Sequence, residues 1–279
     1  MIKRLFTDIS LTKNYRWDTV MYKNEEYLKK MIMGQSRHLF IYGCSGDDRS
    51  KFLQNLEEDY PVTDDLSSPI ALYFNSLGLP HIDTDLEDRD NYIIYKMCRE
   101  YLSFLVATRI LEKSNYFDET ILNDKLSGLI HLINKSSNCD NIVSVSELLD
   151  EMKKSRNFYY DSYIKYTKGL IKEISINEIN IPFLNLEMFV SRYKRCMNMQ
   201  SYFGVIYDKK ERVSVQSIQT INNFIGARIN SDISIKIATN SNEWETYYNT
   251  NGQYVEAIHD YGIIELDDLE DTKKLIKHI

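Results

Sequence analysis

The sequence predicts an α/β fold with a parallel five-stranded sheet flanked by helices, and three observations support this prediction. Five short runs of apolar, β-branched or aromatic residues lie at 37–42, 70–74, 202–207, 233–239 and 261–266. Near-continuous apolar runs of this length are typical of strands buried on both faces of a parallel sheet. Between them, apolar residues recur at the three- and four-residue steps of helices. Strands and helices therefore alternate, which indicates right-handed crossovers in a layered fold.

The helices expected in the sheet region lie on either side of a long insertion. The segment KFLQNLEE follows the first strand, and the apolar positions of two later helices share one face each. Those positions are Leu186, Phe189, Tyr193 and Met197, and then Val215, Ile218, Ile221 and Ile225.

Roughly 125 residues separate the second strand from the third, where a single crossover helix would need far fewer. We interpret residues 77–181 as a helical insertion and residues 1–76 and 182–279 as the α/β core. The helices expected in the insertion span about 91–111, 119–133, 145–154 and 159–174.

Composition excludes several classes of protein. No stretch approaches the ~18 uncharged apolar residues of a membrane-spanning helix, and the first residues, MIKRLFTDISLTK, lack the apolar core of a signal peptide. The four cysteines form no CxxC pair, which favours reduced thiols and a cytoplasmic, non-membrane protein. With 34 basic and 41 acidic residues the net charge is −7, and this disfavours a protein built mainly to grip nucleic acid.

The turn after the first strand has the frame of a phosphate-binding P-loop. It reads GCSGDDRS from Gly43 to Ser50 and leads into a helix, whereas the expected pattern is G-x-x-x-x-G-K-[ST]. Gly43 and Ser50 match, and Gly46 is an additional glycine. Asp48 replaces the second glycine, and Arg49 replaces the lysine. An ordinary polar turn between a strand and a helix is the alternative interpretation.

The two replacements disfavour phosphate binding. A P-loop presents backbone N–H groups to the phosphates, and the position of Asp48 normally needs a residue without a Cβ atom. Repulsion between one carboxylate and a phosphate charge ~4 Å away costs about 4 kcal/mol at an effective dielectric constant of 20. The planar fork of Arg49 differs from the point charge of lysine, and it can pair with Asp47 or Asp48.

A second acidic position follows the third strand. Asp208 ends the run YFGVIYD, where P-loop NTPases hold the aspartate that organises magnesium together with the P-loop serine or threonine. Lys209 comes next, where those enzymes need a carboxylate to position water. We expect its ammonium group to neutralise Asp208, and it cannot serve as a carboxylate base.

From Asp208 the sequence continues as DKKERVSVQSIQTINNFIGARINSDISIKIATNSNEW and later reads EAIHDYGIIELDD. Together with the P-loop frame, these segments resemble bacterial AAA+ ATPases of the origin-recognition-complex-like group. The resemblance covers the P-loop, the strand at 70–74 and nearly all of 187–268, but not the insertion. It implies a P-loop NTPase core, and it leaves no room after the fifth strand for the family's helical lid or a winged-helix domain.

The resemblance also implies roles for individual residues. Ser50 and Asp208 stand at the magnesium-organising positions. Asn240 matches the polar sensor that contacts the γ-phosphate or the attacking water, and Arg228 stands where such families place an arginine finger. Arg49 and Lys209 stand at the positions of the P-loop lysine and the catalytic glutamate.

Three hypotheses of function follow. The first is a degenerate AAA+-type module with no cofactor or only weak ATP/Mg²⁺ binding. It would act as a regulatory or scaffolding subunit beside an effector or an active ATPase subunit, in a homo- or hetero-oligomer, and the resemblance directs attention to bacterial host defence and DNA-associated complexes. The second is an active ATPase switch in which Glu211 or a partner positions water. The third is a nucleic-acid-binding module using the segment Arg192-Tyr193-Lys194-Arg195, where an aromatic residue stands among basic ones.

Overall fold

The computed structural model describes residues 25–43, 47–64, 66–79, 90–137, 142–177, 179–227, 232–240, 243–257 and 259–266. The chain divides into two compact units. The sheet unit consists of Met1–Tyr60, Pro69–Gly78 and Tyr202–Ile279, and the helical unit of Pro61–Ser68 and Leu79–Ser201.

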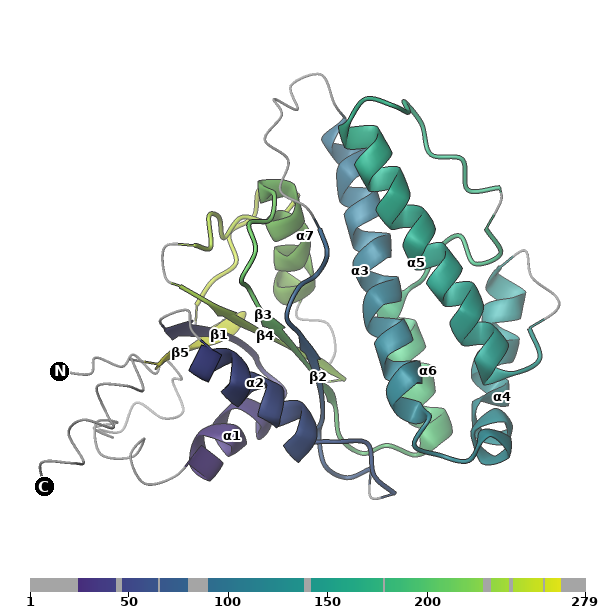
Figure 1. Ribbon diagram of the computed structural model, residues 1–279, viewed down its shortest axis with the longest axis horizontal. Helices are drawn as coiled ribbons and strands as arrows, with labels where there is room; N and C mark the ends of the chain where they lie inside the picture. Colours follow the sequence, from purple (N-terminus) through teal and green to yellow (C-terminus); the bar gives the residue numbers. More distant parts are fainter. Residues whose placement is uncertain are drawn as a thin grey trace, which may run out of the picture. The chain divides into compact units, whose positions relative to one another are not determined.

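The sheet unit contains the predicted five-stranded, all-parallel sheet (Figure 1). Its strands lie in the order β2-β3-β4-β1-β5. They span β1 His38–Gly43, β2 Ile70–Phe74, β3 Phe203–Asp208, β4 Ile233–Thr239 and β5 Tyr261–Leu266. The α/β prediction is therefore confirmed, with β1 and β3 each displaced by one residue from the predicted bounds. Because all strands run in one direction, the residues that follow β1, β2, β3 and β4 meet at one edge of the sheet.

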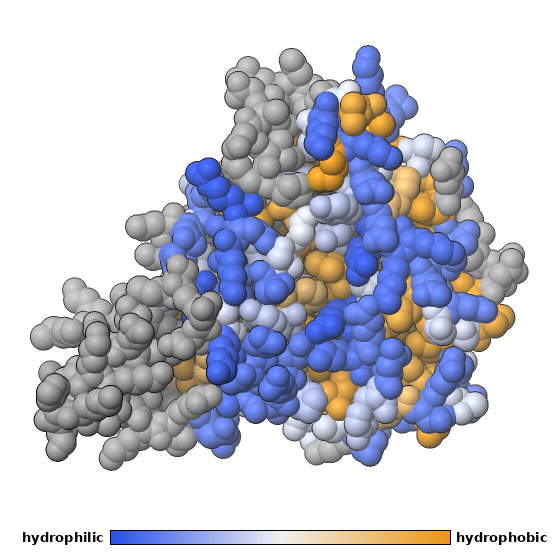
Figure 2. Space-filling view, viewed as in Figure 1, coloured by the Kyte–Doolittle hydropathy of each residue, from blue (hydrophilic) through white to orange (hydrophobic). Residues whose placement is uncertain are grey.

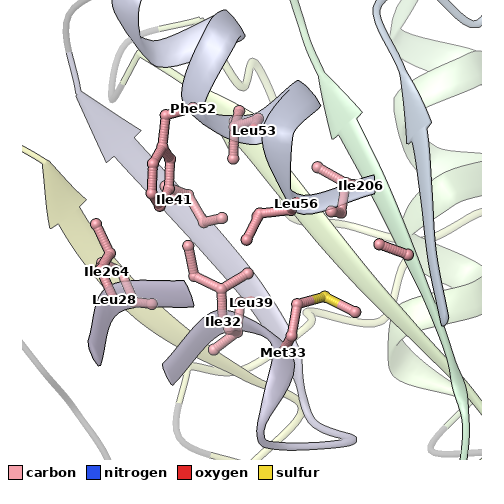
Figure 3. Packing of buried hydrophobic residues seen from close by; sticks show 12 residues of the cluster. Leu28, Ile32, Met33, Leu39, Ile41, Phe52, Leu53, Leu56, Ile206 and Ile264 are labelled. Atoms are coloured by element: carbon pink, nitrogen blue, oxygen red, sulfur yellow. The ribbon is translucent and has the colours of Figure 1, made fainter. Parts of the chain in front are cut away.

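One face of the sheet is covered by α1 (Glu25–Met33) and α2 (Asp47–Asp59). Figure 3 shows Leu28, Ile32 and Met33 of α1 pointing toward the strand residues, beside the apolar side of α2. Gly204 of β3 faces this helix, and a Cβ atom there would lie 2.6 Å from the Met33 Cε atom, so the methionine side chain would have to shift. Helix α1 was not predicted from the sequence.

The opposite face of the sheet packs against α7 (Val215–Gly226) and the segment 243–257. Phe40 of β1 points to this side, and its ring lies 5.3 Å from Trp244 and 4.6 Å from Tyr261, measured between centroids. Val255 is buried and lies beside Gly226 at the end of α7.

The helical unit contains α3 (Asn91–Ser114), α4 (Glu119–Ser136), α5 (Val145–Thr167) and α6 (Leu186–Met197). Helices α3 and α5 pack along each other, and α6 contacts both α3 and α4 (Figure 1). Each helix begins at a side chain that accepts backbone N–H groups of its first turn, which stabilises the start of the helix. These residues are Asp90, Asp118, Ser144 and Asn185.

Two predictions about the insertion need correction. The helices predicted at 145–154 and 159–174 are one helix, α5, because no glycine or proline interrupts 155–158 and Ser155 points inward to bond the Ile181 carbonyl oxygen. Helix α5 ends at Thr167 and not at 174, since Gly169 follows with a φ of 74°. The helical unit also extends to Ser201, beyond the predicted residue 181, because α6 packs on α3 and α4.

On the face that Figure 2 shows, the surface of the helical unit carries both hydrophilic and apolar side chains, and hydrophilic ones lie between the apolar groups. None of the helices in the described ranges has the length and apolar character needed to cross a membrane.

Candidate functional site

The candidate site lies where β1 ends and α2 begins. Gly43 is the last residue of β1 and α2 starts at Asp47, so the expected strand, turn and helix are present. Gly46 and the side chain of Asp48 lie outside the described residues. Arg49 and Ser50 are buried in the first turn of α2, with exposed fractions of 4% and 7%.

The Arg49 guanidinium joins the ends of three strands. Its Nη2 atom lies 2.9 Å from Asp208 Oδ1 at the end of β3. Its Nη1 atom donates to the Gly43 carbonyl oxygen at 3.0 Å and to Asn240 Oδ1, after β4, at 3.4 Å. Asp208 is therefore an ion-pair partner of Arg49 that was not predicted from the sequence, and the side chains of Asp47 and Asp48, its expected partners, lie outside the described residues. The Arg49 side chain turns toward the sheet edge, where a fully buried carboxylate needs a cation.

Asp208 is surrounded by donors. Its Oδ2 atom accepts hydrogen bonds from Ser50 Oγ at 2.6 Å and from the Tyr73 hydroxyl at 3.2 Å. Burial and the neighbouring Asp208 raise the pKa of Tyr73 to about 12, which keeps its hydroxyl protonated as a donor. The Lys210 ammonium lies 3.8 Å from the same Oδ2 atom. Both carboxylate oxygens are thus engaged, and two cations neutralise the charge.

Lys209 does not have the role that the sequence predicted. Within the described residues, the ion pairs of Asp208 are with Arg49 and Lys210 and not with Lys209. Lys209 is buried, and its backbone N–H extends the sheet by donating to the Ala238 carbonyl oxygen at 2.8 Å. Successive side chains of an extended segment point to opposite sides, so the neighbour of an inward-facing Asp208 points away from it.

Glu211 and Asn240 are both held by neighbouring groups. Glu211 Oε1 accepts the Leu77 N–H at 2.8 Å and the Tyr207 hydroxyl at 3.4 Å, which ties the loop after β3 to the end of β2. Asn240 contacts Arg49 through Oδ1 and donates from Nδ2 to Glu243 at 2.6 Å. Arg228, the predicted arginine finger, lies outside the described residues.

These residues fit a guanidinium better than a magnesium ion. Ser50 and Asp208 do lie together, as the resemblance implied, but they bond each other directly and Arg49 already contacts the second carboxylate oxygen. The residues that the structure describes contain no cluster of three or more His, Cys, Asp or Glu side chains suited to a metal. A divalent cation beside Asp208 would have to displace a buried positive charge.

The basic segment on α6 lacks the exposed aromatic residue that base stacking requires. Tyr193 is 1% exposed and bonds Ser114 through its hydroxyl, at 2.6 Å between the oxygens. Helical periodicity accounts for this, since Tyr193 shares the apolar face of α6 with Leu186, Phe189 and Met197.

Sequence reasoning missed Tyr73 and Lys210 as partners of Asp208. The available signal was the position of Tyr73 near the carboxyl end of β2, but the strand order that makes β2 the neighbour of β3 was not predicted. Comparison with known proteins adds no assignment. A scan against models of protein families found no match, and a search of curated proteins found no relative.

Proposed function

We propose that this chain is a degenerate AAA+-type module that does not hydrolyse nucleotide and acts by binding other proteins. The observation that supports the proposal is the buried Arg49 guanidinium, held at once by Asp208, Gly43 and Asn240. It fills the place beside the carboxylate that the cation of a magnesium–nucleotide complex would need.

Moving the Arg49 guanidinium away from Asp208 costs a large free energy. Separating a buried ion pair by removing one partner costs about 3–5 kcal/mol. If a nucleotide had to pull Arg49 away from Asp208, the same energy would weaken its binding by roughly a hundredfold to several thousandfold. Weak or absent binding of ATP/Mg²⁺ follows from this estimate.

Among the described residues that follow β3, no carboxylate is placed to activate water. Lys209 stands at the position where the family has its catalytic glutamate, and a carboxylate base is required there. Glu211, the nearest alternative, already accepts hydrogen bonds from Leu77 and Tyr207. Its role in this proposal is to tie the loop after β3 to β2.

A module that does not hydrolyse nucleotide can still act by binding other proteins through its surface. We propose that the chain is a regulatory or scaffolding subunit of a bacterial multi-protein complex, beside an effector or an active ATPase subunit. This step rests on the family resemblance alone. Any contact with nucleic acid would pass through the complex, because the chain itself is acidic.

The proposal is tested by equilibrium binding of ATP and ADP with magnesium, measured by titration calorimetry. The variant Asp48→Gly/Arg49→Lys restores the P-loop pattern and should gain affinity, whereas the wild type should give no saturable heat below millimolar nucleotide. Lys51→Ala is the matched control, because Lys51 is an exposed cation of α2 and its loss should change nothing. Micromolar, magnesium-dependent binding by the wild type would instead support the alternative of an active nucleotide switch.

A further inference from the structure

An exposed pair of tyrosines stands on a hairpin of the sheet unit. We call residues 246–256 the tyrosine hairpin, drawn in yellow-green beside α7 in Figure 1. Tyr248 and Tyr254 face each other across an antiparallel bridge, and Asn249 and Gly252, with a φ of 73°, close the turn. The two tyrosine rings lie 5.4 Å apart in an edge-to-face arrangement, yet the residues remain 51% and 53% exposed.

Side chains of α7 fix the position of this hairpin. Asn222 is fully buried, and its Nδ2 atom donates to the carbonyl oxygens of Thr246 and Tyr248 at 3.0 and 2.9 Å. Asn223 donates to the Thr250 hydroxyl at 2.6 Å and accepts the Thr250 N–H at 3.3 Å. An exposed loop that is held by hydrogen bonds from Asn222 and Asn223 loses little conformational entropy on binding, which favours its use as an interaction surface.

The segment that carries the tyrosines is acidic. The segment 243–257 carries Glu243, Glu245 and Glu256, all exposed, and its sequence contains no lysine or arginine. Apart from the tyrosines, its other exposed residues are Asn251, Gly252 and Gln253, and asparagine and glycine combine with tyrosine in protein-binding loops. The carboxylates repel nucleic-acid phosphates and attract cationic side chains, and tyrosine faces bind arginine and lysine through cation–π contacts.

We propose that the tyrosine hairpin is a docking site for an arginine- or lysine-bearing segment of a protein partner. Tyr248 and Tyr254 provide the aromatic contact, and Glu245 and Glu256 provide the charge complementarity. This docking site would give the proposed protein-binding function a surface and a class of partner. The proposal rests on that function only in assuming that the chain acts by binding another protein. Peptide binding and ATP turnover are separate measurements, so either proposal can fail without the other.

The test uses the full chain and a fluorescein-labelled peptide of alternating arginine and glycine, followed by fluorescence anisotropy. The same peptide with neutral citrulline in place of arginine is the chemical control. We expect the arginine peptide to bind and the citrulline peptide not to bind. The variant Tyr248→Ala/Tyr254→Ala should weaken binding about tenfold, as two exposed cation–π contacts imply.

Matched variants separate the docking site from general attraction to an acidic protein. The double alanine variant leaves the net charge unchanged, and Tyr248→Phe/Tyr254→Phe keeps the ring faces and should bind as the wild type does. Tyr92→Ala/Tyr116→Ala removes two tyrosines of the helical unit that are 71% and 58% exposed, and it should have no effect.

Equal affinity of the hairpin double alanine variant and the wild type, or equal binding of the citrulline peptide, would overturn the inference. Self-association of the chain that disappears in the hairpin alanine variant would overturn it too, because the occupant would then be a second copy. Single-stranded DNA that competes for the hairpin would likewise contradict the charge argument.

Discussion

Replacing Arg49 by methionine tests whether the ion pair with Asp208 is the central contact of the site. Methionine keeps much of the side-chain length and apolar stem of Arg49 but removes the charge and the donors. The change leaves a fully buried carboxylate without the cation that lies 2.9 Å from it.

The size of the effect follows from what remains around the carboxylate. Breaking a buried pair costs about 3–5 kcal/mol. Asp208 still accepts hydrogen bonds from Ser50 and Tyr73, and Lys210 lies 3.8 Å away, so Arg49→Met should fall at the low end, about 3 kcal/mol. With an m-value of about 2 kcal/mol/M, the urea midpoint should drop by roughly 1.5 M.

The assay is urea unfolding followed by the fluorescence of Trp244, which is buried in the sheet unit. A Trp17→Phe background makes Trp244 the only tryptophan of the chain. A double-mutant cycle compares Arg49→Met, Asp208→Leu and the variant that carries both changes. The loss of unfolding free energy in the double variant should be well below the sum of the two single losses. Lys51→Met, at an exposed position of α2, should stay within about 0.5 kcal/mol of the wild type. Small and additive effects of the single variants would refute the described pairing.

Three further predictions concern the rest of the sheet unit. Glu211→Ala leaves the Leu77 N–H without its carboxylate acceptor and should cost about 1–2 kcal/mol in urea unfolding, whereas a change below 0.5 kcal/mol would contradict the described tie. Asn222→Ala removes buried hydrogen bonds that hold the tyrosine hairpin and should cost about 2–3 kcal/mol, with faster amide exchange in residues 246–256 as the local readout. Burial lowers the pKa of His38 from its ordinary 6.5 to about 4, and the neutral Nδ1 atom accepts the Ile235 N–H. The unfolded chain therefore binds the proton first, so stability should fall by up to roughly 3 kcal/mol between pH 6.5 and pH 4. His38→Asn should remove that part of the pH dependence, and an unchanged pH profile would contradict the assignment.

Periodicity predicted the strands and their bounds well, but it predicted the bounds of the helices less well. All five strands were predicted within one residue, because buried parallel strands are short, apolar and bounded by polar residues. Helix α5 was divided in two because the polar stretch at 155–157 interrupts its apolar pattern, although Ser155 in fact points inward. Helix α1 was missed because it lies among residues with no clear strand or helix pattern around it.

Some residues of the candidate site were predicted from the sequence, but Tyr73, Lys210 and the contacts within the site were not. Arg49, Ser50, Asp208 and Asn240 were named from the sequence, and the structure brings all four together. Asp208 was not predicted as a partner of Arg49, since sequence proximity favoured the neighbouring aspartates. Which carboxylate a buried arginine reaches depends on strand order and register, and neither can be read from one sequence.

The most direct test of the account is ATP turnover by the purified full chain with magnesium, measured as phosphate release. We predict background turnover that Ser50→Ala and Asp208→Asn leave unchanged, because the Arg49 guanidinium occupies the place beside Asp208 in the wild type. Turnover above background that both variants abolish would contradict it. Such a result would mean that Arg49 leaves Asp208 to admit a magnesium–nucleotide complex and that the site is catalytic.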